Sequence, residues 1–127
     1  MEKNEKNEKN DYRVEKDSIG AKDVPENVYY GVQSLRAAEN FHITGLTMHP
    51  EFINSLAYIK KAAAITNCEA GLLDKKIAAA IVKACDEIID GRLHDYFIVD
   101  PIQGGAGTSM NMNANEVIAN RAIDILG

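Results

Sequence analysis

Two amphipathic segments joined by a very short connection place the strongest constraint on the fold of this chain. Residues 50–70 carry apolar side chains at alternating spacings of four and three, which is typical of a helix with one buried face. Residues 74–90 show the same helical periodicity. Because only a few residues around Gly71 separate the two segments, the sequence predicts an antiparallel helical hairpin.

Each helix of this hairpin is expected to pack through one stripe. The stripe predicted for residues 50–70 consists of Phe52, Leu56, Ile59, Ala63 and Thr66. The face predicted for residues 74–90 consists of Ile77, Ile81, Ala84 and Ile88, with Ala80 and Cys85 beside it. Local signals predict the helix ends. Pro50 suits a first turn, Asp74 is a good N-cap, and Gly71 and Gly91 suit the position just after a helix.

The other elements are predicted to be shorter or less regular. Residues 33–40 are interpreted as a short helix, residues 12–30 as extended chain or a small β-hairpin, and residues 92–103 as irregular. Residues 113–126 are expected to form the last helix. Its two adjacent stripes are Val117, Arg121, Ile125 and Ile118, Ala122, Leu126. The predicted fold class is therefore mainly α, with an extended or β-hairpin segment near the N-terminus.

The first residues differ sharply from the rest of the chain. Residues 2–10 repeat Glu-Lys-Asn three times and carry no apolar side chain that could offset the entropy cost of ordering. We therefore expect a disordered tail over residues 1–11 and a single domain over residues 12–127. Because the last predicted helix is apolar over a broad face with little left to cover it, we also expect the chain to be truncated from a longer protein.

Composition excludes several functional classes. The formal net charge of −5 argues against nucleic acid or anionic membrane as partner. No apolar run could span a bilayer, and the polar start carries no signal sequence, so a cytoplasmic location is predicted. Cys68 and Cys85 are expected to be buried, reduced thiols. The three histidines His42, His49 and His94 match no metal-ligand spacing and are interpreted as surface or loop residues, so neither a metal site nor a cofactor is predicted.

A glycine-rich loop runs into the last helix. Glycines 104, 105 and 107 let the backbone approach a ligand closely, and Thr108, Ser109 and Asn111 are good helix N-caps. A helix start presents unpaired N–H groups and partial positive charge, so this pattern indicates a small-anion site. The loop lacks the lysine of a phosphate-binding P-loop and the third glycine of a dinucleotide fingerprint. The alternative is an ordinary loop followed by a capped helix.

The loop also carries a family resemblance. The stretch GGAGTSMNMNANEVIANR at residues 104–121 resembles the first signature of the aspartase/fumarase superfamily. Residues 13–20, 24–37 and 60–64 resemble further parts of its N-terminal region, in the same order. Class II fumarases carry a serine at the position of Ala106 and a glutamine at that of Ser109, so the loop resembles the ammonia-lyase branch. The resemblance thus implies reversible elimination of ammonia from L-aspartate to give fumarate.

The resemblance implies further properties. It implies a helical three-domain subunit and a homotetramer whose active sites are each assembled from three subunits. It implies that Thr108 binds the dicarboxylate substrate and that Gly107 and Ser109 supply further donors; the alternative for Ser109 is a capping role alone. Residues Asn111, Asn113 and Asn115 are interpreted as helix-start and packing residues.

The later family signatures are missing. A serine in a Gly-Ser-Ser loop is the family's general base, and this chain has no such loop, so no catalytic residue is assigned and the chain alone is expected to be inactive. Two other functions remain alternatives to an ammonia-lyase. One is a class II fumarase or related lyase. The other is a non-catalytic helical binding domain, and the absence of the general-base motif favours this second alternative.

Overall fold

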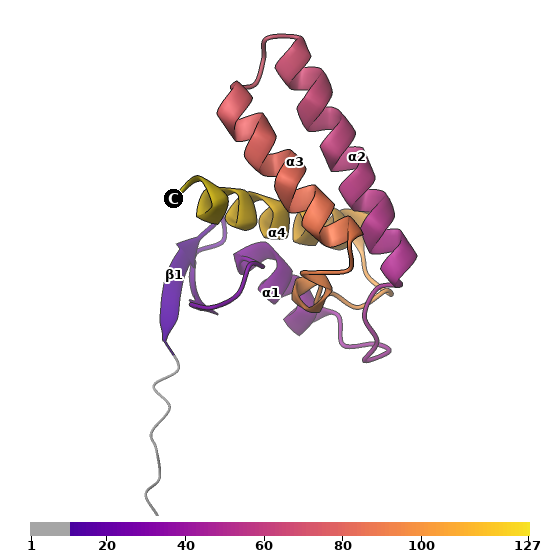
Figure 1. Ribbon diagram of the computed structural model, residues 1–127. Coiled ribbons are helices and arrows are strands. Elements are labelled where there is room, and N and C mark those ends of the chain that lie inside the picture. The colour runs from indigo at the N-terminus through magenta and orange to yellow at the C-terminus, as the bar shows by residue number, and fades with distance from the viewer. Residues whose placement is uncertain (1–10) are drawn as a thin grey trace, which may run out of the picture.

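The computed structural model describes residues 11–127, which form four α-helices and one β-hairpin (Figure 1). The elements in chain order are β1 (Tyr12–Lys16), β2 (Ala21–Pro25), α1 (Val32–Asn40), α2 (Pro50–Glu69), α3 (Lys75–Ile89), the short 3-10 turns η1 (His94–Tyr96) and η2 (Gly105–Gly107), and α4 (Thr108–Leu126). The predicted mainly α fold class is confirmed. Residues 1–10 of the predicted tail lie outside the described residues. The carbonyl of Asp11, the tail's last residue, accepts a hydrogen bond from the Glu26 N–H at 2.8 Å.

Strands β1 and β2 form the small hairpin that was one of the two expectations for the N-terminal region. They pair antiparallel, with Arg13 opposite Val24. The Asp17 carboxylate accepts hydrogen bonds from the N–H groups of Ile19 and Gly20, both at 3.0 Å, and so stabilises the turn between the strands.

Helices α2 and α3 form the predicted antiparallel hairpin (Figure 1). Asp74 caps α3 as predicted, because its carboxylate accepts hydrogen bonds from the N–H groups of Lys76 and Ile77. Gly71 and Gly91 follow the two helix ends with φ of +74° and +86°. Their N–H groups bond to carbonyls three residues earlier, which closes both helices in the left-handed turn that glycine favours.

The predicted buried face of α2 is wrong. Phe52 and Ile59 are 45% and 61% exposed, Ala63 and Thr66 are exposed, and Leu56 is only half-buried. The face that packs inward consists of Ile53, Ala57 and Ala64. The helix is apolar on two adjacent faces, and the small alanines let α3 and α4 approach closely. On α3 the prediction holds except at Ile77, which is 43% exposed near the connection between the two helices, and at the half-buried Ile81.

Helix α4 passes beneath the α2–α3 hairpin and separates it from α1 and the β-hairpin (Figure 1). Its residues Val117, Ile118 and Ala122 are buried as predicted, Arg121 and Ile125 are half-buried, and Leu126 is exposed, which corrects the predicted stripe. The hydrophobic core forms where α4 meets the hairpin. It consists of Met48, Ile53, Ala57, Ala84, Cys85, Ile88, Phe97, Val99, Ala114, Val117 and Ile118.

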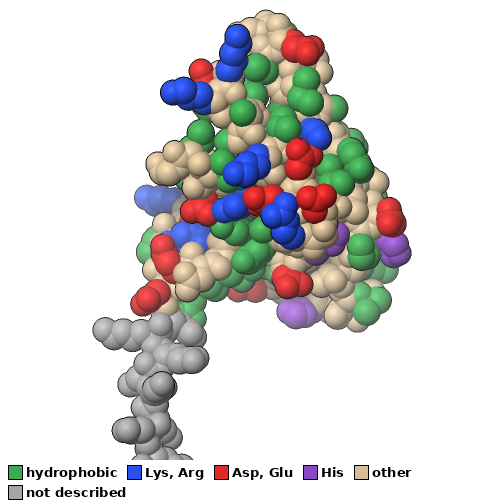
Figure 2. Space-filling model, viewed as in Figure 1, with side chains coloured by type: hydrophobic (Ala, Val, Ile, Leu, Met, Phe, Trp, Pro, Cys, Tyr) green, Lys and Arg blue, Asp and Glu red, His purple; other side chains and the backbone are tan. Residues whose placement is uncertain are grey.

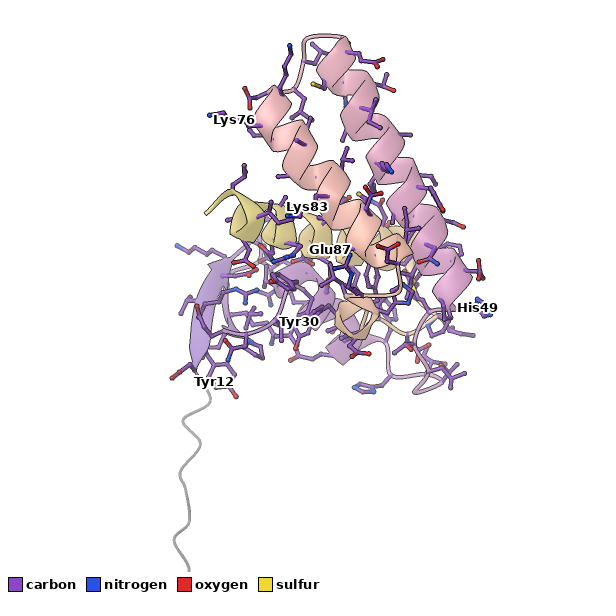
Figure 3. The ribbon with its side chains drawn as sticks, in the orientation of Figure 1. Tyr12, Tyr30, His49, Lys76, Lys83 and Glu87 are labelled. Atoms are coloured by element: carbon purple, nitrogen blue, oxygen red, sulfur yellow. The ribbon has the colours of Figure 1, made fainter. Side chains whose placement is uncertain are left out.

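An ion pair joins α4 to α3. The Arg121 guanidinium donates to both carboxylate oxygens of Glu87, at 2.6 and 3.0 Å, and Glu87 points toward α4 in Figure 3. This hydrogen bonding from Arg121 lowers the pKa of Glu87 although burial opposes the shift. Arg121 also donates to Asp124 at 2.6 Å and lies 5.6 Å from the centre of the Tyr29 ring. Figure 2 shows acidic and basic side chains intermixed across the middle of this face.

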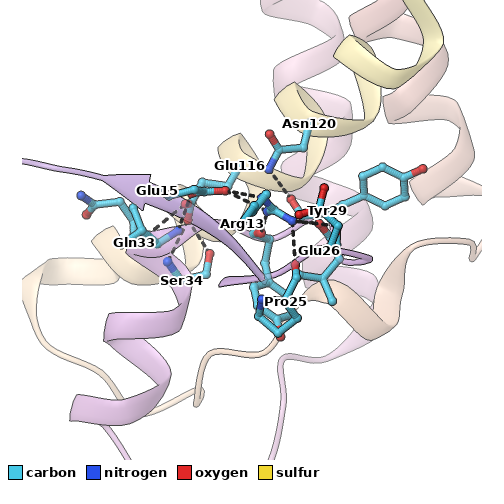
Figure 4. Close-up of polar contacts among 12 residues, drawn as sticks. Arg13, Glu15, Pro25, Glu26, Tyr29, Gln33, Ser34, Glu116 and Asn120 are labelled. Atoms are coloured by element: carbon cyan, nitrogen blue, oxygen red, sulfur yellow. Dashed lines mark hydrogen bonds and ion pairs between the residues drawn. The ribbon is translucent and has the colours of Figure 1, made fainter. Parts of the chain in front are cut away.

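Two glutamates hold the start of α1 (Figure 4). The Glu116 carboxylate accepts hydrogen bonds from the N–H of Gln33 at 3.1 Å and from the N–H and hydroxyl of Ser34 at 2.8 and 2.6 Å. Glu15 accepts from the Val32 N–H at 2.9 Å. The α1 N-terminus therefore binds two carboxylates of the chain itself, which satisfies its unpaired N–H groups and complements its dipole.

The structure confirms the predicted burial for only one of the two cysteines. Both thiols are free. Cys85 is fully buried, and burial raises its pKa to about 11, whereas Cys68 is half-buried, which corrects the prediction for that residue. Of the histidines, His42 and His49 are exposed, while His94 is half-buried and its Nε2 lies 2.9 Å from the Ile88 carbonyl oxygen. None of the helices within residues 11–127 has the length and apolar character needed to cross a bilayer.

Candidate functional site at the start of α4

The segment that leads into the glycine-rich loop is anchored by Asp100. Only 4% of this residue is exposed, and its carboxylate accepts hydrogen bonds from the Thr44 N–H at 2.8 Å, the Thr44 hydroxyl at 2.9 Å and the Gly45 N–H at 3.0 Å. Its second oxygen accepts from the Ile102 N–H at 2.8 Å. Asp100 thus fixes the loop before α2 against the entry to the glycine-rich loop. Sequence analysis did not assign it a role.

The ionisation of Asp100 leads to a testable prediction on acid stability. Burial alone would raise its pKa, but the hydrogen bonds from Ile102, Thr44 and Gly45 hold the pKa at about 2, below the usual 3.8. A lowered carboxyl pKa stabilises the fold above about pH 4 and loses that effect as the pH falls toward 2. We therefore expect Asp100→Asn to unfold more easily than the unmodified chain at pH 6, with the difference shrinking between pH 4 and 2.

Thermal unfolding of both proteins across this pH range would measure the difference. Asp90→Asn is the matched control, because Asp90 is exposed and pairs only with the exposed Arg92. A difference between Asp100→Asn and the unmodified chain that stays constant from pH 6 to 2 would contradict the prediction.

The loop backbone is left-handed over three consecutive residues. Gly105, Ala106 and Gly107 have φ of +71°, +52° and +88°. Glycine adopts this region without steric cost, whereas Ala106 is a non-glycine residue there and is held in place by its surroundings. A side chain at Gly105 would begin 3.1 Å from the Thr108 hydroxyl oxygen, so the glycine allows the loop to close tightly against the helix start.

Helix α4 begins at Thr108, five residues before the predicted start. Its N-cap is Gly107, with no side-chain capping bond, so the prediction that Thr108, Ser109 or Asn111 caps the helix is wrong. The first turn is instead stabilised from outside the helix, because the Gln103 side chain accepts a hydrogen bond from the Met110 N–H at 2.8 Å. A sequence pattern cannot show a cap that comes from a residue on the far side of a loop, which explains the misplaced start.

The structure places the three predicted substrate-binding residues at this helix start. Thr108 is exposed and its hydroxyl donates to the Gly105 carbonyl, while Gly107 and Ser109 are half-buried. The Ser109 hydroxyl has no hydrogen-bond partner within residues 11–127. Hydroxyls and backbone N–H groups at the positive end of a helix form an arrangement suited to a small anion.

The three asparagines of α4 differ in role. Asn113 is fully buried; its amide oxygen accepts from the Ile98 N–H and its amide nitrogen donates to the Tyr96 carbonyl, both at 2.9 Å. Asn111 accepts a hydrogen bond from the Lys60 ammonium at 2.7 Å, which joins α4 to α2. The Asn115 amide contacts the sulfur of Met112. Asn113 is thus the packing residue that the sequence predicted. In the part of the chain that the structure describes, no three His, Cys, Asp or Glu side chains are grouped to hold a metal ion.

The chain belongs to the lyase family, because the family model described as "Lyase" matches residues 20–127. One relative, an aspartate ammonia-lyase from a Bacillus species, is 62% identical over 117 residues, which cover 92% of this chain and 25% of the relative. A class II fumarate hydratase from Halobacterium salinarum is 53% identical over 117 residues, covering 92% of this chain and 25% of the relative.

Solved structures show the same fold. A fumarate lyase:delta crystallin from Brucella melitensis superimposes with a TM-score of 0.91 at 52% sequence identity, covering 92% of this chain and 28% of that one. The family resemblance seen in the sequence is therefore confirmed. The chain spans about a quarter of the length of the curated relatives it matches.

Proposed function

We propose that this chain is the N-terminal part of an aspartate ammonia-lyase, which eliminates ammonia from L-aspartate to give fumarate. The observation that carries the proposal is the Gly-Gly-Ala-Gly-Thr-Ser loop, which closes in a left-handed turn and presents Thr108 at the first position of α4. The high identity to relatives that bear this name supports the same reading.

The contribution of this chain is to bind one carboxylate of the substrate. The start of α4 offers partial positive charge, and Thr108, Gly107 and Ser109 offer a hydroxyl, a backbone N–H and a second hydroxyl. The Thr108 hydroxyl now donates to the Gly105 carbonyl; rotation of that hydroxyl would turn its proton toward a bound carboxylate. In the proposed reaction, a base outside these residues removes a proton next to the carboxylate, and ammonia leaves from the adjacent carbon.

The test is the Thr108→Val variant of the full-length protein, because valine keeps the shape of threonine and removes the hydroxyl. A hydrogen bond to a charged group contributes about 1.5 to 3 kcal/mol, so we expect kcat/KM for L-aspartate to fall by roughly tenfold to a hundredfold. Ammonia release measures the rate. Thr66→Val is the matched control, since Thr66 is an exposed threonine on α2, and it should leave the rate unchanged. Equal rates for both variants would refute the role of Thr108.

A class II fumarate hydratase is the second candidate, favoured by the relative from Halobacterium salinarum. The two enzymes differ in the group that leaves, so comparing L-aspartate with L-malate as substrates of the full-length protein separates them. Fumarate formation from malate without ammonia release from aspartate would establish the hydratase. If neither reaction occurs, a non-catalytic binding domain becomes the better-supported function. The homotetramer and the cytoplasmic location stay predictions.

A further inference from the structure

The Gln103 side chain bridges the two ends of the glycine-rich loop. Its amide nitrogen donates to the Asp100 carbonyl at 2.8 Å, and its amide oxygen accepts from the Met110 N–H at 2.8 Å. A carbonyl only accepts and an N–H only donates, so the orientation of this amide is unambiguous. One half-buried side chain therefore connects Asp100, four residues before the loop, to Met110, the third residue of α4.

The loop that Gln103 closes has few other restraints. Residues 104–107 carry no side chain larger than that of Ala106, so they cannot pack into the core on their own. Gly104 lies against Phe41: a side-chain carbon at Gly104 would be 3.2 Å from the Phe41 ring. The Thr108 hydroxyl bonds back to Gly105 within the loop itself. The Gln103 amide, in contrast, bonds directly to backbone groups on both sides of the loop, at Asp100 and Met110.

The segment before the loop is itself attached to another part of the fold. The carbonyl that Gln103 holds belongs to Asp100, whose carboxylate is bonded to Thr44 and Gly45. Gln103 therefore fixes the first turn of α4 relative to this anchored segment. Without the amide, the segment before the loop would still be attached to α4 by Asn113, but that attachment is at Tyr96 and Ile98, several residues before the loop.

We propose that Gln103 is a positioning residue for the dicarboxylate site, holding Thr108 and Ser109 in the geometry that binds the substrate without touching the substrate itself. The inference rests on the proposed function of this loop. It predicts that loss of the amide loosens the loop and weakens dicarboxylate binding while the fold stays intact. A site loses affinity when its supporting side chains no longer fix it, because the ligand then has to order it on binding.

The experiment compares Gln103→Met and Gln33→Met in the full-length protein. Methionine matches the length of glutamine and removes both polar groups. Gln33 is also half-buried and donates one side-chain hydrogen bond, to Asp17 at 3.2 Å on the β-hairpin turn, so its variant is the matched control. For Gln103→Met we expect faster hydrogen exchange at the backbone amides of residues 105–110 and a Kd for fumarate raised about tenfold. We expect a thermal midpoint close to that of the control.

A third variant separates the two bonds. Gln103→Glu retains an acceptor for the Met110 N–H but, when ionised, cannot donate to Asp100. We expect it to restore slow exchange at Met110 but not at Gly105 and Ala106.

The outcomes separate the two proposals. Fumarate binding and loop exchange in Gln103→Met equal to those of Gln33→Met would overturn the positioning role and leave the proposed function standing. Weakened fumarate binding that is matched by an equal loss in Gln33→Met would also overturn it, because the effect would then be a general loss of stability. Failure of the unmodified full-length protein to bind fumarate would overturn both.

Discussion

Gly31→Ala is expected to destabilise the chain by about 2 to 4 kcal/mol, since it combines overpacking with the loss of a helix cap. A methyl group at this buried position would lie 2.0 Å from one carboxylate oxygen of Glu116 and 2.8 Å from an oxygen of Glu15. The backbone itself would tolerate alanine, because φ of Gly31 is −121°. The cost therefore comes from displacing Glu116, which holds the N–H groups of Gln33 and Ser34.

Urea denaturation followed by circular dichroism would measure this loss, and a double-mutant cycle identifies its cause. Glu116→Ala removes the side chain that the new methyl group meets. We therefore expect Gly31→Ala to cost much less in the Glu116→Ala background than alone. Equal costs in the two backgrounds would show that the contact with Glu116 is not responsible.

Asn113→Ala is expected to be the second strongly destabilising change, at about 3 to 4 kcal/mol. The fully buried amide pairs the Ile98 N–H and the Tyr96 carbonyl, and both would lose their partner. Each unpaired buried group costs about 1 to 3 kcal/mol, and the truncated side chain leaves a cavity beside the core. The segment that contributes the buried Phe97 and Val99 would lose its attachment to α4.

Asn111→Ala is the control for this prediction, because Asn111 lies on the same helix and makes one hydrogen bond, from Lys60, in a half-buried setting. Removing it should cost about 1 kcal/mol or less. Thermal unfolding of the two variants side by side measures the difference. If Asn113→Ala unfolds at the same temperature as Asn111→Ala, the buried amide does not have the proposed role.

The features that sequence reasoning predicted correctly are those set by neighbouring residues. The N-cap at Asp74 and the glycines after α2 and α3 follow rules that act within one turn of a helix. The short connection around Gly71 left the two helices no arrangement other than an antiparallel hairpin. The glycine-rich loop and the helix behind it were recognised for the same reason, since their residues are consecutive.

The features that it missed depend on partners far along the chain. Spacing in α2 predicted a buried stripe, but the helix is apolar on two faces, and the choice of Ile53 over Phe52 is made by α3 and α4. The start of α4 was placed five residues late because its first turn is capped by Gln103 from across the loop. The anchoring role of Asp100 was not predicted because its partners, Thr44 and Gly45, lie more than fifty residues earlier in the chain.

The polar anchors of the N-terminal region have a consequence for folding during synthesis. The β-hairpin and α1 leave the ribosome before α4, yet several of the groups that fix them belong to α4: Glu116 binds the start of α1, and Asn120 and Asp124 bind Tyr29. These bonds join residues 82 to 95 positions apart. The α2–α3 hairpin, whose contacts are local, can assemble earlier. The β-hairpin and α1, although synthesised before α4, are therefore fixed in position only after α4 has been made.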